Sequence, residues 1–151
     1  MSYLKIQFLF LGSITVFLPV SYYHGYIPLL IPYLYLFLGL LTYVFYATDK
    51  AAAERSSQRI SEATLHILAI TCGWPGAIVA QEKLRHKTIK TEFRRIFWMT
   101  VVANYLLLLS LLTNFGSSIL HRLITGLEQL VMETIGQSIP GKIILALCLF
   151  Q

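Results

Sequence analysis

The sequence predicts an all-α protein with several membrane spans. Two observations support this prediction: the amino-acid composition and the spacing of the apolar residues. Hydrophobic residues make up 56% of the 151 residues and charged residues only 13%, about half the share of about a quarter found in soluble domains. The apolar residues gather in long uncharged runs separated by short polar stretches. So little charge cannot cover the surface of a soluble domain of this length, which disfavours a soluble enzyme, a coiled coil and a disordered tail.

Three uncharged runs are predicted to cross the bilayer as helices: residues 6–23, 27–48 and 96–115. Each comes close to the about 20 residues that a spanning helix needs. No small-residue cleavage site follows the first run, so we expect an uncleaved span rather than a signal peptide. The short linker around Gly25 predicts that the first two spans form a tight antiparallel hairpin. Asn104 interrupts the third span, and we expect its side chain to bridge two helices by a hydrogen bond.

A fourth apolar run, residues 63–81, is interrupted by the sequence Gly73, Trp74, Pro75, Gly76. Proline removes a backbone donor and clashes with the preceding helical turn, and freed backbone groups are costly in lipid. We therefore expect a broken helix pair that lies at the interface or enters the membrane as a re-entrant loop. A kinked full span stays open as the alternative.

Basic residues are concentrated in the segment 49–95. Nine of the twelve Lys and Arg residues lie there: Lys50, Arg55, Arg59, Lys83, Arg85, Lys87, Lys90, Arg94 and Arg95. They flank the broken run on both sides, so the positive-inside rule places this segment in the cytoplasm and favours a run that does not cross. With three spans, the amino terminus is then cytoplasmic and the carboxyl terminus outside. The net charge of +5 indicates an anionic partner, first of all the lipid surface.

The predicted organisation has two parts. Residues 1–115 form the membrane domain, including the basic segment 49–95, and residues 116–151 form a carboxyl-terminal region with a short apolar tail. Within that region, residues 118–135 show the apolar periodicity of an amphipathic helix, with Ser118 as the expected N-cap. Its polar face carries few basic residues, so we expect it to pack on the spans or on a partner helix rather than on anionic lipid.

Polar residues next to the predicted spans supply acid and base groups. Ser61 is placed to cap a helix whose first turn would hold Glu62, and the spacing of Arg59, Glu62 and His66 predicts that they share one helix face. The candidate catalytic residues are Asp49, Glu62, His66 and His86. No nucleophile–base motif or paired-carboxylate spacing accompanies them, and a Glu–His pair one turn apart is more often a surface ion pair.

A basic cluster follows the broken run. A helix beginning near Thr88 would present its amino-terminal amides to an anion, and neighbouring basic side chains could converge on the same group. The candidate anion-binding residues are Arg59, Arg85, His86, Lys87 and Lys90. The ligand could be a lipid headgroup, a nucleotide or RNA; RNA fits worst because Phe93 is the one aromatic residue available for stacking. Plain topology signalling with lipid contact explains the same charges.

Four motifs in close order resemble a known family. They read YxxDK from Tyr46, RISExxLHxLA from Arg59, CGWPGA from Cys72, and RHKTxKxxFR from Arg85. Together they are similar to the membrane family catalogued as domain of unknown function 1294, over about residues 43–98. The resemblance implies a small bacterial membrane protein, and the cytoplasmic cold-shock domain of some relatives agrees with the orientation derived above. It implies no reaction. The chain departs from the family at Cys72, where a Gly-Gly pair is common.

These observations predict a binding or scaffold protein of the bacterial inner membrane, whose cytoplasmic basic face engages anionic lipid headgroups or another phosphate ligand. Two less favoured alternatives stay open: a membrane-embedded enzyme that acts on a lipid-linked substrate, and an oligomeric transporter or channel subunit. The near absence of charge inside the spans disfavours a polar path within one copy. No motif calls for a metal or a cofactor, because Cys72 and Cys148 lack any zinc spacing. The expected partners are the lipid bilayer and a second copy or another membrane protein, with nucleic acid the weakest candidate.

Overall fold

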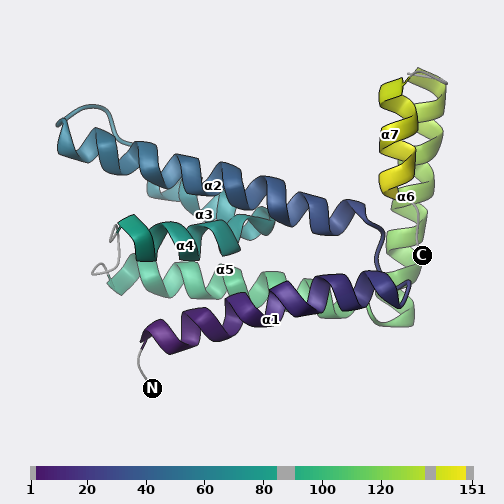
Figure 1. Ribbon diagram of the computed structural model, residues 1–151, viewed down its shortest axis with the longest axis horizontal. Helices are drawn as coiled ribbons and strands as arrows, with labels where there is room; N and C mark the ends of the chain where they lie inside the picture. The colour runs from purple at the N-terminus through teal and green to yellow at the C-terminus, as the bar shows by residue number, and fades with distance from the viewer. Residues whose placement is uncertain (1–2, 85–90, 135–138, 149–151) are drawn as a thin grey trace. The chain divides into compact units, whose positions relative to one another are not determined.

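The computed structural model describes residues 3–84, 91–134 and 139–148, and every regular element in those ranges is helical. The helices, in chain order, are α1 (Tyr3–Tyr23), α2 (Leu30–Glu54), α3 (Glu62–Leu68), α4 (Trp74–Leu84), α5 (Thr91–Ser110), α6 (Asn114–Thr134) and α7 (Ile139–Cys148) (Figure 1). This confirms the predicted fold class. The chain divides into two compact units: unit 1 comprises Met1–Gly12 and Leu34–Leu106, and unit 2 comprises Ser13–Tyr33 and Leu107–Gln151.

Within the described ranges, three helical stretches are long and apolar enough to cross a membrane: α1, α2, and Glu62–Leu84 through α3 and α4. The first two correspond to predicted spans. The prediction of one further span over 96–115 is wrong in its bounds, because α5 ends at Ser110 and qualifies only together with α6, as a bent pair. The reason is a helix cap inside the apolar run.

That cap begins α6 earlier than the sequence predicted. The hydroxyl of Thr113 accepts a hydrogen bond of 3.2 Å from the backbone N–H of Gly116, which is the N-cap arrangement. Gly116 also lies so close to Ser110 that an added Cβ would overlap the carbonyl of Ser110. Ser118, the expected N-cap, therefore lies inside α6, where its hydroxyl donates to the carbonyl of Phe115.

The broken run contains two short helices that do not share an axis. Ser61 caps α3 as predicted, with its hydroxyl accepting from the backbone N–H of Thr64 at 3.1 Å. The helical backbone is interrupted at Thr71 and Cys72, and Cys72 has the left-handed φ of 75° that favours glycine. Pro75 follows in the first turn of α4, where its missing N–H would have no helical partner in any case. The break thus lies nearly one turn before Pro75.

Two contacts with α2 show that α3 and α4 run in opposite directions. The start of α3 and the end of α4 both lie beside the carboxyl-terminal part of α2. At that end, the backbone N–H of Ile60 lies 3.0 Å from the Asp49 carboxylate, and the amide of Gln81 lies 3.3 Å from the Tyr46 hydroxyl. Asp49 and Tyr46 are one turn apart on α2. Although Glu62–Leu84 passes as one span by length and composition, the segment is a helical hairpin. We call it the α3–α4 hairpin.

Glycine lets the tip of this hairpin approach α2 closely. An added Cβ at Gly76 would overlap the backbone carbonyl of Gly39, and one at Gly73 would overlap the Thr42 hydroxyl. Gly39 itself has room, because its added Cβ would lie 3.5 Å from the backbone nitrogen of Gly76. Small residues that permit close backbone contact are typical of helix pairs in membranes.

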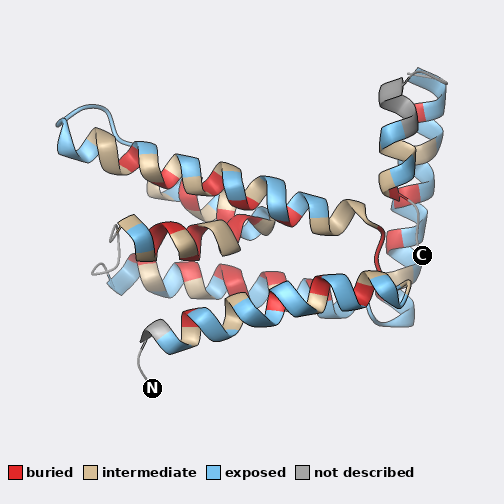
Figure 2. Cartoon of the chain, viewed as in Figure 1, coloured by how far each residue is buried: buried red, intermediate tan, exposed pale blue. Residues whose placement is uncertain are grey.

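Large apolar side chains are exposed on the helices of unit 1, and Figure 2 shows how exposed and buried positions alternate along these helices. On α2, Leu36, Phe37 and Leu40 are 71%, 64% and 66% exposed, and Met99 and Leu106 on α5 are similar. Isolated exposed apolar residues are ordinary, but continuous apolar helix faces are what a helix presents to lipid. The fold is therefore compatible with a membrane protein.

Unit 2 contains the predicted amphipathic helix. Helix α6 buries Gly116, Leu120, Ile124 and Val131, which recur at the spacing of one helix face, and its polar residues lie elsewhere on the surface. Helix α7 packs against α6, in place of the short apolar tail expected from the sequence.

Candidate functional site

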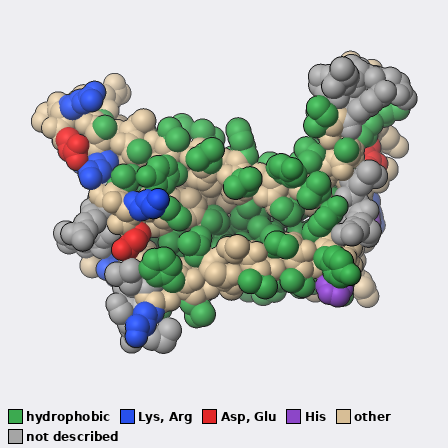
Figure 3. Space-filling view, in the orientation of Figure 1, with side chains coloured by type: hydrophobic (Ala, Val, Ile, Leu, Met, Phe, Trp, Pro, Cys, Tyr) green, Lys and Arg blue, Asp and Glu red, His purple; other side chains and the backbone are tan. Residues whose placement is uncertain are grey.

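The start of α1, the end of α2, both ends of the α3–α4 hairpin and the start of α5 lie at one end of unit 1 (Figure 1). In Figure 3 the charged side chains of unit 1 lie at this end, while hydrophobic side chains cover the neighbouring surface. We call it the charged end. It carries Lys5, Lys50, Arg55, Arg59, Lys83, Arg94 and Arg95, with the acids Asp49, Glu54, Glu62, Glu82 and Glu92.

Asp49 is the buried acid of the charged end, with no exposed surface. One carboxylate oxygen accepts the hydrogen bond from the Ile60 N–H, and the Nε atom of Arg59, a half-exposed side chain, lies 3.7 Å from the same oxygen. A buried carboxylate is tolerated when hydrogen bonds and an opposite charge compensate it. Asp49 thereby fixes the loop 55–61 to the end of α2.

Of the other acid–base candidates, Glu62 and His66 both belong to α3. Glu62 lies in the first turn of α3, as predicted. The ring of His66 lies 4.3 Å from the ring of Phe93, which in turn lies 6.3 Å from the ring of Tyr46. His66 therefore belongs to an aromatic layer that joins α2, α3 and α5. His86 lies outside the described residues.

Of the predicted anion-binding residues, the described part of the chain includes Arg59 alone; Arg85, His86, Lys87 and Lys90 lie outside it. Arg59 precedes α3, which begins at Glu62, so the predicted helix face shared by Arg59, Glu62 and His66 is wrong. The Ser61 cap starts the helix after Arg59 and leaves the guanidinium beside Asp49. Among the residues that the structure describes, no group of three or more His, Cys, Asp or Glu could hold a metal ion.

Arg59 pairs with the buried Asp49, whereas, in the part of the chain that the structure describes, the exposed cations of the charged end pair with no buried acid. Lys50 pairs with Glu54 at 3.6 Å on the surface of α2, a spacing that stabilises a helix by only a few tenths of a kcal/mol. Lys5, Arg55, Lys83 and Arg95 are exposed, and within the described ranges they form no ion pair. These four side chains come from α1, the loop after α2, α4 and α5, and they remain available to an external anion.

Deeper in unit 1, Asn104 joins α5 to α2 and to the hairpin break, as the sequence predicted for a bridging amide. Its Oδ1 atom accepts from the Tyr35 hydroxyl and, at 3.1 Å, from Nε1 of Trp74. Its Nδ2 atom donates to the backbone carbonyl of Ile70 at 2.8 Å. Because the break removes regular helical bonding near Ile70, this contact satisfies a carbonyl that lipid could not.

Sequence reasoning missed Gln7. Its side chain is 1% exposed, and neither polar atom of its amide has a hydrogen-bond partner among the residues that the structure describes. The signal was present in the sequence, because Gln7 is an amide close to the start of an otherwise apolar run. It lies within the predicted span over residues 6–23.

Removing the Asp49 carboxylate is expected to release the loop 55–61. We expect Asp49→Ala to lower the free energy of unfolding in detergent by about 2 kcal/mol, because it leaves the Ile60 N–H and Arg59 without their acceptor. Trypsin should then cut faster at Arg55 and Arg59. Lys50→Gln, which removes an exposed pair on the same turn, should change neither readout; equal effects of the two variants would contradict a special role of Asp49.

Unit 1 defines a class of protein: an all-helical chain with helices that could cross a membrane and a helical hairpin packed between them. Residues 39–93 match the family model described as "Protein of unknown function (DUF1294)", which confirms the resemblance found from the four motifs. No curated protein and no solved structure matches the chain. The matched segment contains Asp49, the α3–α4 hairpin and the Gly39–Gly76 contact, and excludes Gln7 and Asn104.

Proposed function

We propose that this chain is a bacterial inner-membrane protein whose cytoplasmic charged end binds anionic groups, in the first place the phosphates of lipid headgroups. The observation that supports it is a set of four exposed cations that form no ion pair with the residues that the structure describes: Lys5, Arg55, Lys83 and Arg95. They belong to separate segments whose ends lie at one end of unit 1. A basic residue near an anionic leaflet contributes about 1 kcal/mol to binding. The candidates Arg85, His86, Lys87 and Lys90 would extend this surface.

The hairpin geometry supports the orientation. Because α3 and α4 begin and end at the same end of unit 1, the basic residues on both sides of the hairpin face one compartment. The positive-inside rule then places that compartment in the cytoplasm, with the amino terminus on the same side. Reporter fusions after Lys50 and after Arg95 test this orientation: both should report the cytoplasm, and opposite sides would contradict it.

The binding proposal is tested with the full chain in nanodiscs that contain phosphatidylglycerol or only phosphatidylcholine, and with inorganic pyrophosphate as the soluble phosphate. We expect the triple variant Arg55→Gln, Lys83→Gln, Arg95→Gln to enrich phosphatidylglycerol about tenfold less, with a weaker dependence on salt. Arg122→Gln on α6 is the control, since it removes a positive charge from unit 2. Pyrophosphate binding would indicate a soluble ligand, and an unchanged triple variant would contradict the proposal.

A further inference from the structure

A shallow, open groove of about 510 Å³ follows the outer face of α5. Its lining residues recur three or four positions apart, so they share one face of the helix: Arg95, Trp98, Met99, Val102, Ala103 and Leu106. Met99 and Leu106 are 65% and 62% exposed, and the groove is therefore open to whatever surrounds α5. Ala103 has the smallest of these side chains and leaves room between its larger neighbours. We call this feature the α5 groove.

A contact with α1 holds one wall of the α5 groove in place. The rings of Phe10 on α1 and Trp98 pack edge to face, with their centroids 5.1 Å apart. The ring of Phe10 packs in the same way on Tyr105, at 5.6 Å. Edge-to-face pairs favour a defined ring orientation, so the Trp98 wall is formed before any ligand binds. A preformed wall lowers the cost of ordering the site on binding.

The α5 groove has a cation at one end and apolar side chains along the rest of its length. Arg95 belongs to the charged end, is exposed, and forms no ion pair within the described ranges. A guanidinium can donate two parallel hydrogen bonds to a phosphate. From Arg95 to Leu106 the helix rises about 16 Å at 1.5 Å per residue, and half of the hydrocarbon core of a bilayer is about 15 Å. The groove therefore has the length of one lipid leaflet.

This combination of charge and length favours a phospholipid over a second copy of the chain. Two copies in one bilayer have the same orientation, so a symmetric contact between their α5 helices would bring both Arg95 side chains to the same depth. Like charges at one depth disfavour that contact. A phospholipid instead brings a negative charge to the depth of Arg95 and an acyl chain to the depth of Met99 and Leu106.

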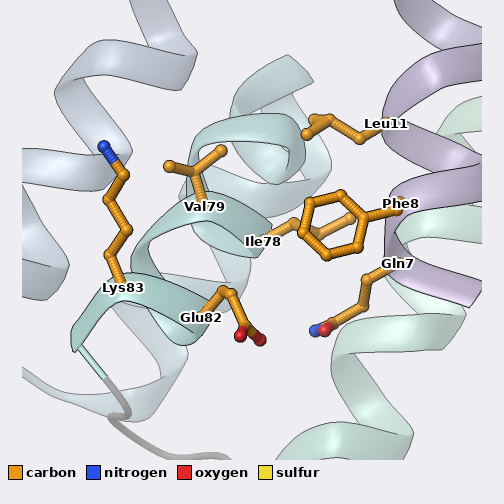
Figure 4. A pocket seen from close by; sticks show the side chains of 7 residues that line it. All are labelled: Gln7, Phe8, Leu11, Ile78, Val79, Glu82 and Lys83. Carbon is orange, nitrogen blue, oxygen red and sulfur yellow. The ribbon is translucent and has the colours of Figure 1, made fainter. Parts of the chain in front are cut away.

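The hollow between α1 and α4 lacks this combination (Figure 4). It measures about 160 Å³, and Phe8, Leu11 and Val79 are among its apolar lining residues. The Gln7 amide beside it is buried, and in Figure 4 the Lys83 side chain extends away from Gln7 and Phe8. A charged headgroup therefore has a partner at the α5 groove and not at this hollow.

We propose that the α5 groove binds one acyl chain of an anionic phospholipid whose phosphate pairs with Arg95. Trp98, Met99 and Val102 contact the upper methylenes of the chain, and Leu106 contacts its end near the middle of the bilayer. The inference rests on the proposed function for the charge of the headgroup, and it adds a defined place for the chain. The basic surface attracts lipids by charge alone, whereas the groove holds a single lipid along α5.

Photolabelling of the full chain in nanodiscs tests the proposal. The probes are phosphatidylglycerol and phosphatidylcholine that carry a diazirine in the middle of one acyl chain, each added in trace amount to phosphatidylcholine. Mass spectrometry then locates the labelled peptides. We expect phosphatidylglycerol to label residues 98–106 of α5 more than the equally exposed face of α2 around Leu36 and Leu40. The phosphatidylcholine probe should label the α5 peptide about fivefold less, which corresponds to the about 1 kcal/mol of one basic residue near an anionic lipid.

Two variants separate the groove from the charge. Ala103→Phe fills the groove without changing the charge, and it should reduce α5 labelling to the level of α2. Leu40→Phe, at an exposed position of α2, is the control and should leave α5 labelling unchanged. Arg95→Gln should remove the difference between the two lipids at α5, and it keeps the test decisive if Ala103→Phe folds poorly.

Three outcomes would overturn the proposal: equal labelling of α2 and α5 in the unchanged chain, α5 labelling that survives Ala103→Phe, or a lipid difference that survives Arg95→Gln. Crosslinking of two copies through α5 would also overturn it and identify a second copy as the occupant. Even labelling of the unchanged chain, combined with lost phosphatidylglycerol enrichment in the triple variant, would remove the groove alone and leave the proposed function intact. Unchanged enrichment in the triple variant, combined with α5 labelling that Arg95→Gln lowers, would do the reverse.

Discussion

Replacing Gly76 by alanine should separate α4 from α2. The added methyl group would overlap the carbonyl of Gly39, and backbone cannot move aside as the end of a flexible side chain can. Overpacking of this kind destabilises by about 1–3 kcal/mol, which exceeds the about 0.5–1 kcal/mol that alanine gains over glycine within a helix. We expect Gly76→Ala to lower the free energy of unfolding by about 2 kcal/mol, measured by SDS titration in micelles with the fluorescence of Trp74 and Trp98.

The same substitution on the other side of this contact provides the control. The added Cβ of Gly39→Ala would lie 3.5 Å from the nearest atom of Gly76, an ordinary van der Waals contact. Helix propensity should then dominate, so we expect Gly39→Ala to be neutral or stabilising by up to about 1 kcal/mol. The two alanines should thus have opposite signs. A destabilised Gly39→Ala with a neutral Gly76→Ala would show that the hairpin packs in a different register.

The apolar runs predicted α1 and α2 because a helix that faces lipid needs little besides length and hydrophobicity. The Ser61 cap could also be predicted, since a cap depends on residues close in sequence. The end of α5 could not be predicted in this way. Both sides of the turn at 111–113 are apolar, and the cap by Thr113 has no signal that distinguishes it from the neighbouring Ser110 and Ser118.

The sequence predicted a broken helix pair in residues 63–81, but it did not predict where the helix breaks. Proline marked a break, but the interruption falls at Cys72, where sequence propensity alone gives no reason for a left-handed residue. What permits it is tertiary: Asn104 contacts the freed carbonyl of Ile70, and Gly76 contacts Gly39. Both contacts join residues that are distant in sequence, so the local sequence pattern around the break could not predict them.

The sequence identified which residue types could form the candidate site, but not how the folded chain arranges them in space. Asp49 was predicted as an acid at the end of a span, but its burial depends on the return of the chain to place Ile60 and Arg59 beside it. The burial of Gln7 likewise depends on α4, which follows it by about half the chain. The concentration of Lys and Arg in residues 49–95 is visible in the sequence itself, and the role of that segment as a cytoplasmic basic face stays a prediction.

Asn104→Leu is expected to open the break of the α3–α4 hairpin. Leucine fills a similar volume, but it leaves the Tyr35 hydroxyl, the Trp74 Nε1–H and the Ile70 carbonyl without their shared partner. An unpaired buried group costs about 1–3 kcal/mol, while hydrogen bonds between membrane helices contribute about 0.6–2 kcal/mol each. We therefore expect a loss of about 2–4 kcal/mol, measured by the same SDS titration.

A second readout shows whether that loss is local to the break. The thiol of Cys72 is half-buried and lies 4.0 Å from the Asn104 amide nitrogen, so opening of the hairpin should speed its reaction with a maleimide in a Cys148→Ser background. Thr100→Val is the matched control on α5, because the buried Thr100 hydroxyl donates to the Phe97 carbonyl of its own helix and, within the described part of the chain, has no hydrogen bond to another helix. Both readouts should stay nearly unchanged. If Asn104→Leu were as stable as Thr100→Val and left Cys72 equally protected, the glycine contact with α2 would suffice to hold the hairpin, and the Asn104 bridge would be dispensable.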